Sequence, residues 1–308
     1  MFGLVPAWFF LLGTVIGSFL NVVVYRLHTG RSVNGRSHCL SCGKYLAWYE
    51  LIPIVSYLAQ RGRCRGCGAH ITVRYAAVEA LTGVLFLLIA RHFLFDSVLL
   101  ALNLGSVALL VVIVAYDLRH TIIPDELVLY LSAFAVAYIL WNPLTHSVAL
   151  PSPETILGGV LPALFFWGLW LISGGRWVGL GDAKLIFPLG LMVGAWGSVS
   201  LFILAFWIGA VTGVGILAMQ TLMRVVMSRG IPRRGFRFLA TRLTTTSEEQ
   251  DTRLHVSYPS AGVAKYHRCF TMKSEVPFAP FLVVAFFLVQ LAQVDVLALV
   301  AALMSLVV

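Results

Sequence analysis

Four of the five cysteines form two closely spaced pairs, a pattern that is typical of a metal site. Two residues separate Cys39 from Cys42, two separate Cys64 from Cys67, and residues 43–63 lie between the pairs. Four thiolates at this spacing bind a structural zinc ion in tetrahedral geometry. Two disulfides are the alternative interpretation. A site closed by four protein ligands leaves no open position for water, so we expect the zinc to be structural and not hydrolytic.

Two aspartates lie where apolar segments begin or end. Asp117 follows the apolar run that ends at Tyr116, and Asp182 belongs to the sequence GLGDAK just before another apolar run. Ionisable residues at such positions are costly and often functional. Two carboxyl groups at one membrane edge form a possible dyad, with one ionised to activate water and the other protonated to assist a carbonyl. The spacing alone also allows two simple ion pairs, of Asp117 with Arg119 and of Asp182 with Lys184.

The other acidic residues near apolar segments have simpler interpretations. Asp125 follows Ile123 and Pro124 and is expected to cap the start of a helix. Glu50 and Glu79 are expected to be interfacial or helix-end residues. Asp295 lies in the last apolar stretch, where it either marks the outer end of a span or lines a polar cavity.

The composition decides the class of protein that carries these residues. The chain has 308 residues, of which 59% are hydrophobic and 11% are charged, and its mean hydropathy is +0.90. A soluble protein of this length would carry about 25% charged residues. The composition therefore excludes a soluble globular enzyme and a disordered chain.

Apolar windows of the length needed to cross a membrane, about 20 residues, recur along the sequence. The last of them contains Asp295, and residues 197–198 separate the short sixth window from the seventh. The windows cover residues 4–25, 78–95, 98–116, 127–141, 156–172, 185–196, 199–223 and 278–308. We predict an all-α polytopic membrane protein with about eight transmembrane helices and a small cytoplasmic zinc-binding domain.

The positive charges predict the orientation of the chain. All Lys and Arg residues except Arg91 fall in four segments between windows, at residues 26–77, 117–124, 173–184 and 224–277. Lys and Arg remain on the cytoplasmic side, so the N-terminus is expected outside. The net charge of +9 thus records orientation, and we expect no nucleic-acid partner. Because cytoplasmic thiols stay reduced, this orientation favours zinc over disulfides.

The expected organisation has five parts. Residues 1–25 form the first transmembrane helix, and residues 26–77 form the zinc-binding domain. Residues 78–223 carry helices two to seven with both aspartates, residues 224–276 form a basic cytoplasmic loop, and residues 277–308 form the last transmembrane segment. The loop is expected to be solvated or to touch anionic lipid headgroups, and its Cys269 is expected to be unpaired.

Several motifs in a fixed order resemble those of the bacterial type IV prepilin peptidase family, also called leader peptidase/N-methyltransferase. The motifs are residues 17–27 (GSFLNVVVYRL), the two cysteine pairs with residues 48–53 between them, Arg74-Tyr75 with Val78-Glu79, Asp117 with Ile123-Pro124-Asp125, residues 179–184 (GLGDAK), and residues 276–281 (VPFAPF). The GLGD sequence matches the family's GxGD signature. The resemblance covers most of the chain.

This resemblance implies an aspartic endopeptidase of the bacterial inner membrane that removes the leader of prepilins and pseudopilins. By motif position, Asp117 and Asp182 correspond to the family's catalytic pair and the four paired cysteines to its zinc site. The resemblance also implies that S-adenosylmethionine donates a methyl group to the new N-terminus, with residues 26–77 contributing to that site. The lipid bilayer and the prepilin or pseudopilin substrates are the partners that it implies.

The sequence departs from the family pattern at three places. His28 stands where proline is common, Ala279 replaces a usual glycine, and the loop at 224–276 is longer than the family norm. None of these departures touches the aspartates or the paired cysteines. No Rossmann-type glycine loop marks a methyl-donor site, so a member with peptidase activity alone is an open alternative.

Two further interpretations differ in class. A presenilin-like intramembrane protease would share the GLGD sequence, but the tripeptide Pro162-Ala163-Leu164 precedes it here instead of following it, and such proteases lack the cysteine pairs. A transporter or membrane scaffold would require more than one carboxylate within the spans, and only Asp295 qualifies.

Overall fold

The computed structural model describes residues 4–27, 35–142, 147–148, 150–228 and 277–293. Almost all of this part of the chain is helical, which confirms the predicted all-α class. The long helices are α1 (Leu4–Arg26), α3 (Val73–Phe93), α4 (Ser97–His120), α5 (Asp125–Leu140), α6 (Pro153–Ser173), α7 (Leu180–Ser228) and α9 (Ala279–Ala292). Two strands of two residues each, β1 (Trp141–Asn142) and β2 (Ser147–Val148), pair antiparallel after α5.

Five of the described helices are long and apolar enough to cross a membrane. They are Val5–Arg26, Val73–Phe93, Ser97–His120, Pro153–Ser173 and Leu180–Leu222. Helices α5, with 16 residues, and α9, with 14, are apolar but shorter. Each predicted window overlaps one of these helices, while the number of eight spans stays a prediction.

Helix α7 holds two of the predicted windows in one assignment of 49 residues. A straight helix of that length would measure about 73 Å, more than twice the roughly 30 Å of a bilayer core. A break divides it at Gly194, whose φ of 73° is left-handed. The predicted break at residues 197–198 is therefore wrong. The physical reason is the approach of α6: a Cβ atom on Gly158 would lie 2.4 Å from the carbonyl carbon of Gly194.

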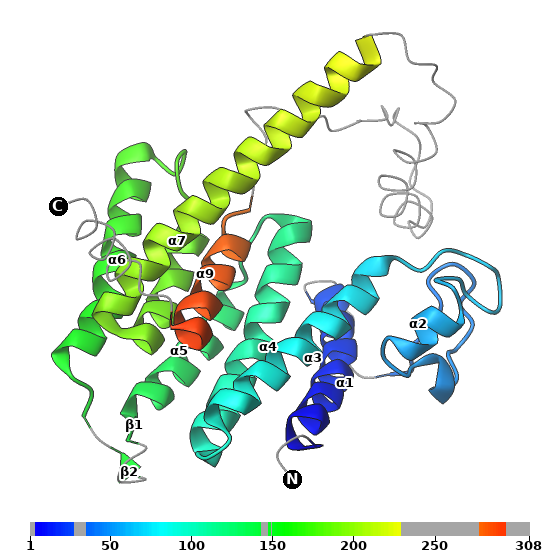
Figure 1. Ribbon diagram of the computed structural model, residues 1–308, viewed down its shortest axis with the longest axis horizontal. Coiled ribbons are helices and arrows are strands. Elements are labelled where there is room, and N and C mark those ends of the chain that lie inside the picture. Colours follow the sequence, from blue (N-terminus) through cyan, green and yellow to red (C-terminus); the bar gives the residue numbers. More distant parts are fainter. Residues whose placement is uncertain (1–3, 28–34, 143–146, 149, 229–276, 294–308) are drawn as a thin grey trace, which may run out of the picture.

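The helices stand in the order α6, α7, α5, α4, α3 and α1, with α9 against α7 and α4 (Figure 1). Their shared core consists of buried apolar side chains from most of these helices, such as Leu110, Leu185, Leu282 and Phe286. Because lipid is as apolar as these side chains, close packing and not hydrophobicity holds such a bundle together. The core fixes the end of α4 beside the start of α7, where Asp117 and Asp182 lie.

Residues 35–72, here called the cysteine domain, join α1 to α3. They include a short 3-10 helix, η1 (Trp48–Glu50), and α2 (Val55–Ala59), which lies beyond α1 in Figure 1. Helices α1 and α3 pack closely through glycines: a Cβ on Gly13 would lie 2.7 Å from the Cβ of Phe86, and one on Gly17 would lie 2.9 Å from the Cα of Glu79. This contact fixes the two chain ends from which the cysteine domain emerges.

The orientation of the bundle is a prediction that cysteine labelling tests. Ser152 is exposed at the start of α6, and Ser247 belongs to the basic loop, outside the described residues. In a Cys269→Ser background, a membrane-impermeant maleimide should label Ser152→Cys in intact cells and Ser247→Cys only after permeabilisation, because basic segments stay in the cytoplasm. Labelling of Ser247→Cys in intact cells would overturn the orientation and the cytoplasmic position of both aspartates.

Candidate functional site

Asp117 lies in the last turn of α4. The helix starts where Asp96 Oδ1 accepts hydrogen bonds from the N–H groups of Val98 and Leu99, each at 3.0 Å. It ends at Thr121, which has a left-handed φ of 54° and donates its N–H to the Asp117 carbonyl oxygen at 2.7 Å. The residues at the two ends of α4 thus fix where the helix begins and ends, and this places Asp117 in its last turn.

The Asp117 side chain is only 4% exposed. Its Oδ2 atom is buried and has no hydrogen-bond partner among the described residues. A buried carboxylate oxygen without a partner is unfavourable, so the fold holds Asp117 in this position at a cost in stability. The simple ion pair with Arg119, which the spacing allowed as an alternative, is not found among the described residues; the Arg119 guanidinium carbon lies 5.8 Å from the ring centroid of Tyr25 on α1.

Asp182 lies in the first turn of α7, and the two glycines of its motif each permit a close approach. The Asp182 N–H donates a hydrogen bond to the Gly179 carbonyl oxygen at 3.2 Å, and a Cβ on Gly179 would stand 3.3 Å from Asp182 Oδ2. A Cβ on Gly181 would stand 3.0 Å from the Cβ of Ile123, in the segment that connects α4 to α5. The GLGD sequence therefore brings the start of α7 against the segment that follows Asp117.

The structure brings Asp117 and Asp182 together, although residues 118–181 separate them in the sequence. Their carboxyl groups are close enough to interact electrostatically. Two carboxyl groups held near each other resist ionising together, which is the arrangement of an acid–base dyad.

An ion pair next to this site excludes one alternative that the spacing allowed and corrects the capping role expected of Asp125. Lys184 Nζ donates to Asp125 Oδ1 at 2.8 Å and to Oδ2 at 2.9 Å, so Lys184 does not pair with Asp182. Asp125 is not a helix cap either, because Pro124 occupies the capping position and Asp125 is the first helical residue of α5. The sequence indicated that Lys184, two residues after Asp182, could form an ion pair near the site. It did not indicate that the partner of Lys184 is Asp125.

This ion pair joins the first turn of α5 to the first turn of α7. The Asp125 side chain is 70% exposed and the Lys184 side chain is 41% exposed. Exposed pairs contribute about 0–1 kcal/mol to stability. We therefore assign the Asp125–Lys184 pair to positioning the start of α7, where Asp182 lies, more than to overall stability.

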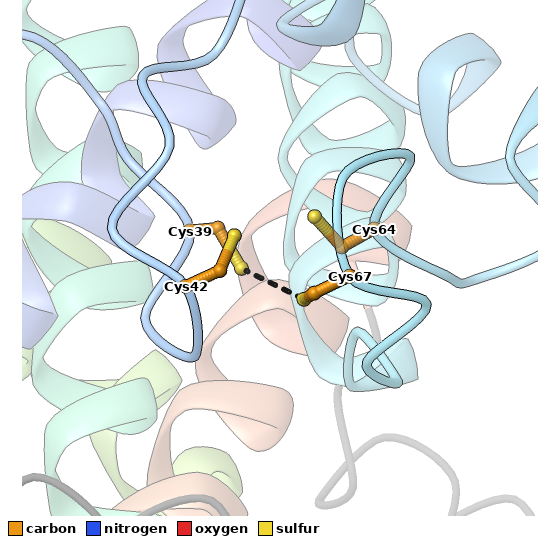
Figure 2. Close-up of side chains that lie close together, drawn as sticks. All are labelled: Cys39, Cys42, Cys64 and Cys67. Atoms are coloured by element: carbon orange, nitrogen blue, oxygen red, sulfur yellow. Dashed lines mark hydrogen bonds between the residues drawn. The ribbon is translucent and has the colours of Figure 1, made fainter.

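The four paired cysteines come together in the cysteine domain. Cys39 and Cys42 lie on one loop and face Cys64 and Cys67 on the other (Figure 2). All four sulfur atoms lie within 4.8 Å of one another, and Cys39 Sγ lies 3.9 Å from Cys67 Sγ. A tetrahedral zinc ion with Zn–S bonds of about 2.3 Å requires sulfurs about 3.8 Å apart. The cluster therefore fits a metal ion held by four thiolates.

The two loops have the same backbone turn. Gly43 N–H donates to the Cys39 carbonyl oxygen and Gly68 N–H to that of Cys64, both at 2.9 Å. Both glycines have a left-handed φ of 71° that bulkier residues rarely adopt. These turns are the local reason why the two cysteines of each pair place their sulfurs close together.

One cysteine of the cluster, Cys64, has a thiol pKa that favours the thiolate form needed for metal binding. Burial opposes ionisation of Cys64, but the backbone N–H groups of Cys67 and Gly66 lower the pKa of its thiol to about 7. Burial raises the pKa of Cys39 to about 11. Metal binding requires thiolates, so an ion would displace the remaining protons.

The cysteine domain has almost no core of its own. Among its described residues only Glu50, Gly62 and Cys64 are buried. Glu50 accepts a hydrogen bond from the Ala47 N–H at 2.9 Å; this contact, followed by the nearby Lys44 charge, lowers the pKa of its carboxyl group. Without apolar burial, a bound metal is the expected source of much of the domain's stability.

Some of the residues named from the sequence lie outside the described residues. Cys269 and Asp295 are among them. Of the predicted basic loop, residues 224–228 belong to α7, and the rest lies outside the described residues. The expectations for these residues stay predictions.

The fold and site define a polytopic helical membrane protein with an approaching pair of aspartates and a four-cysteine cluster. Comparison with known families identifies its kind. Residues 11–93 match the bacterial peptidase A24 N-terminal domain, and residues 104–214 match the type IV leader peptidase family. The first match contains the four paired cysteines, and the second contains both aspartates.

Three relatives, each named prepilin leader peptidase/N-methyltransferase, illustrate the similarity. The Myxococcus xanthus protein is 36% identical over 221 residues, covering 70% of this chain and 64% of its own length. The Dichelobacter nodosus protein is 30% identical, covering 67% and 81% respectively. The Pseudomonas putida protein is 31% identical, covering 70% and 83%. This chain belongs to the type IV leader peptidase family, as the motifs predicted. No solved structure matches it.

The cysteine cluster predicts a stoichiometric metal. Purified protein should contain about one zinc ion per chain, and the Cys39→Ser/Cys64→Ser variant should lose it, because two thiolates cannot hold the ion alone. Elemental analysis measures the zinc. The control is Cys269→Ser, which removes a cysteine outside the cluster and should retain full zinc. Full zinc content in the double variant would contradict the site.

The Asp125–Lys184 pair predicts an energetic coupling between α5 and α7. Asp125→Asn, Lys184→Met and the double variant should show a coupling of about 0.2–1 kcal/mol in the free energy of unfolding, since the pair is exposed. Unfolding in mixed micelles measures it. Glu154→Gln, which changes an acidic residue of α6, is the control and should not couple to Lys184→Met. A zero coupling for Asp125 would remove the positioning role.

Proposed function

We propose that this protein is a membrane aspartic endopeptidase that removes the leader peptide of type IV prepilins or pseudopilins, and that it methylates the new N-terminus with S-adenosylmethionine as donor. The single observation that carries the proposal is the approach of Asp117 and Asp182 from distant helices. The names of the relatives, which include both activities, support it.

Cleavage needs a base and an acid on opposite sides of one peptide bond. One of the two carboxyl groups takes a proton from water as the water attacks the carbonyl carbon, and the other donates a proton to the carbonyl oxygen. Oδ2 of Asp117, which has no hydrogen-bond partner among the described residues, is available for such a contact, and Gly179 lies close beside Oδ2 of Asp182. Four cysteines would close the coordination of zinc, so the proposed role of the metal is to support the cysteine domain.

An apolar groove beside Asp182 supports a membrane-embedded substrate. It has a volume of about 870 Å³ and lies between α5, α6 and α7. Apolar side chains that include Leu129, Leu164 and Trp167 line it, together with Leu180 and Ala183, which lie within two residues of Asp182 in sequence. Asp125 and Lys184 also line it. We propose that the hydrophobic helix of the substrate occupies this groove, which would place its leader junction at the aspartates.

The proposed location is the bacterial cytoplasmic membrane, crossed several times, with the N-terminus outside and the aspartates facing the cytoplasm. The distribution of Lys and Arg supports this orientation. The cytoplasm supplies both the prepilin leader and the methyl donor. A family member with peptidase activity alone is the second candidate, because no sequence motif marks the donor site.

Single substitutions of the aspartates should abolish cleavage. Asp117→Asn and Asp182→Asn keep the side-chain shape but end proton transfer, so each should lower the cleavage rate by about 10²–10⁴-fold. The double variant should be little worse than either single one, because the residues act as a unit. Cleavage of purified prepilin in detergent, followed by mass spectrometry, measures leader removal and the mass gain of one methyl group together.

Asp125→Asn is the matched control, since it makes the same chemical change near the same site. It transfers no proton in the proposed reaction and weakens only the positioning pair with Lys184, so it should lower cleavage far less than either aspartate variant, and zinc content should show that all variants are folded. Substantial cleavage by Asp117→Asn or Asp182→Asn would remove the dyad. Cleavage by the unaltered protein without the methyl mass would identify a member with peptidase activity alone.

A further inference from the structure

A cavity of about 600 Å³ lies between the helices and the cysteine domain, and neither aspartate lines it. Its walls are the C-terminal part of α1, the first turns of α3 and the cysteine domain. Small-molecule sites occupy about 300–1,000 Å³. The cavity is therefore large enough for a nucleoside-sized ligand and too small for a folded partner.

Glu79 of α3 brings a negative charge to this cavity. Its Oε2 accepts a hydrogen bond from the Ile54 N–H at 2.8 Å, and the Ser18 side chain of α1 lies near its carboxylate. Both neighbours are neutral, and no cation in the described part of the chain forms an ion pair with Glu79. A carboxylate within an apolar helix is costly unless a partner compensates it, so the cavity wall offers a site for a cation.

The backbone beside Glu79 is strained. Ile54 has a φ of 61°, a left-handed value that is rare for a β-branched residue. Residues in such conformations persist only where their surroundings hold them, and they concentrate at functional sites. Here the Glu79 carboxylate holds Ile54 through the hydrogen bond to its N–H, and thereby fixes the cysteine domain against α3.

The rest of the lining suits a nucleoside that carries a cation and a carboxylate. Four tyrosines contribute aromatic rings, which stack on bases and attract organic cations. Arg36, whose guanidinium carbon lies 5.6 Å from the Tyr45 ring centroid, also lines the cavity and provides a cation for a ligand carboxylate. The tyrosines are Tyr25, Tyr45, Tyr57 and Tyr75.

The cavity wall contacts α4, the helix that carries Asp117. Tyr25 forms part of the cavity wall, and its ring is the one that the Arg119 guanidinium approaches at 5.8 Å. Arg119 lies in the last turn of α4, two residues after Asp117. The cavity and the aspartates therefore share α4 as a common neighbour.

We propose that this cavity binds the methyl donor, a sulfonium nucleoside of the S-adenosylmethionine type, with its sulfonium group facing Glu79; the proposal rests on the methyl transfer proposed above. The neutral amine of the new N-terminus attacks the methyl carbon. The N–C bond forms as the C–S bond breaks, and its electron pair stays on sulfur, which becomes a neutral thioether. The positive charge passes to the methylated nitrogen and remains beside Glu79.

Calorimetry with the purified, zinc-containing full chain tests this assignment. S-adenosylmethionine and S-adenosylhomocysteine are the two probes, because only the first carries the sulfonium charge. Glu79→Gln keeps an oxygen for the Ile54 N–H but removes the negative charge. It should weaken S-adenosylmethionine binding at least about tenfold and leave S-adenosylhomocysteine binding within about twofold of the unaltered protein.

A second pair of variants tests the cavity itself. Ala76 lines it, whereas its neighbour Ala77 is exposed on α3. Ala76→Trp should weaken the binding of both probes at least about tenfold by filling the space, and the control Ala77→Trp should bind both normally. Normal binding by Ala76→Trp would overturn the location, and equal weakening of both probes by Glu79→Gln would overturn the role of the charge.

Failure of the inference and failure of the proposed function are distinguishable in these measurements. If the unaltered protein cleaves prepilin but binds neither probe, the methyl transfer and this inference both fail while the peptidase stands. If it binds and methylates but the Ala76→Trp variant does so too, only the assignment of the cavity fails.

Discussion

The carboxyl groups of Asp117 and Asp182 come from helices that are distant in sequence, and they lie near each other at the end of a bundle with few charges. Several contacts in the structure hold them in this position. The left-handed Thr121 ends α4 one turn after Asp117. Gly181 lets α7 approach Ile123, and the Asp125–Lys184 pair joins the first turns of α5 and α7. Because like charges repel, only contacts outside the pair can hold it together.

The bundle provides these contacts without help from the hydrophobic effect between its helices. Glycines allow the backbones of α6 and α7, and of α1 and α3, to approach closely, as is common where lipid surrounds the helices. The α1–α3 contact also fixes the cysteine domain, which has almost no buried apolar residues among its described part and for which a metal on the four thiols is the expected source of stability. The aspartate pair and the cysteine domain therefore share one scaffold, with Tyr25 and Arg119 in contact between α1 and α4.

The sequence was sufficient for features that depend on local pattern. Hydropathy predicted the helices, and motif spacing predicted the cysteine cluster. The family resemblance named both aspartates, whose catalytic role stays a prediction. Features that depend on distant contacts were missed. Lys184 and Asp125 are 59 positions apart, so spacing favoured the nearer Asp182, and the break in α7 lies at Gly194 because α6 approaches there. The sequence also did not indicate a ligand-binding role for Glu79, because its neutral neighbours and the adjoining cavity are formed by residues distant in sequence.

The pH dependence of prepilin cleavage tests the central claim, that Asp117 and Asp182 act as one acid–base unit, most directly. The quantity to measure is kcat/KM across the pH range in which the zinc content of the purified protein stays constant. The account predicts a bell-shaped profile with two apparent pKa values that belong to the pair and not to either residue. A profile governed by a single ionisation would contradict it, because only one carboxyl group would then take part.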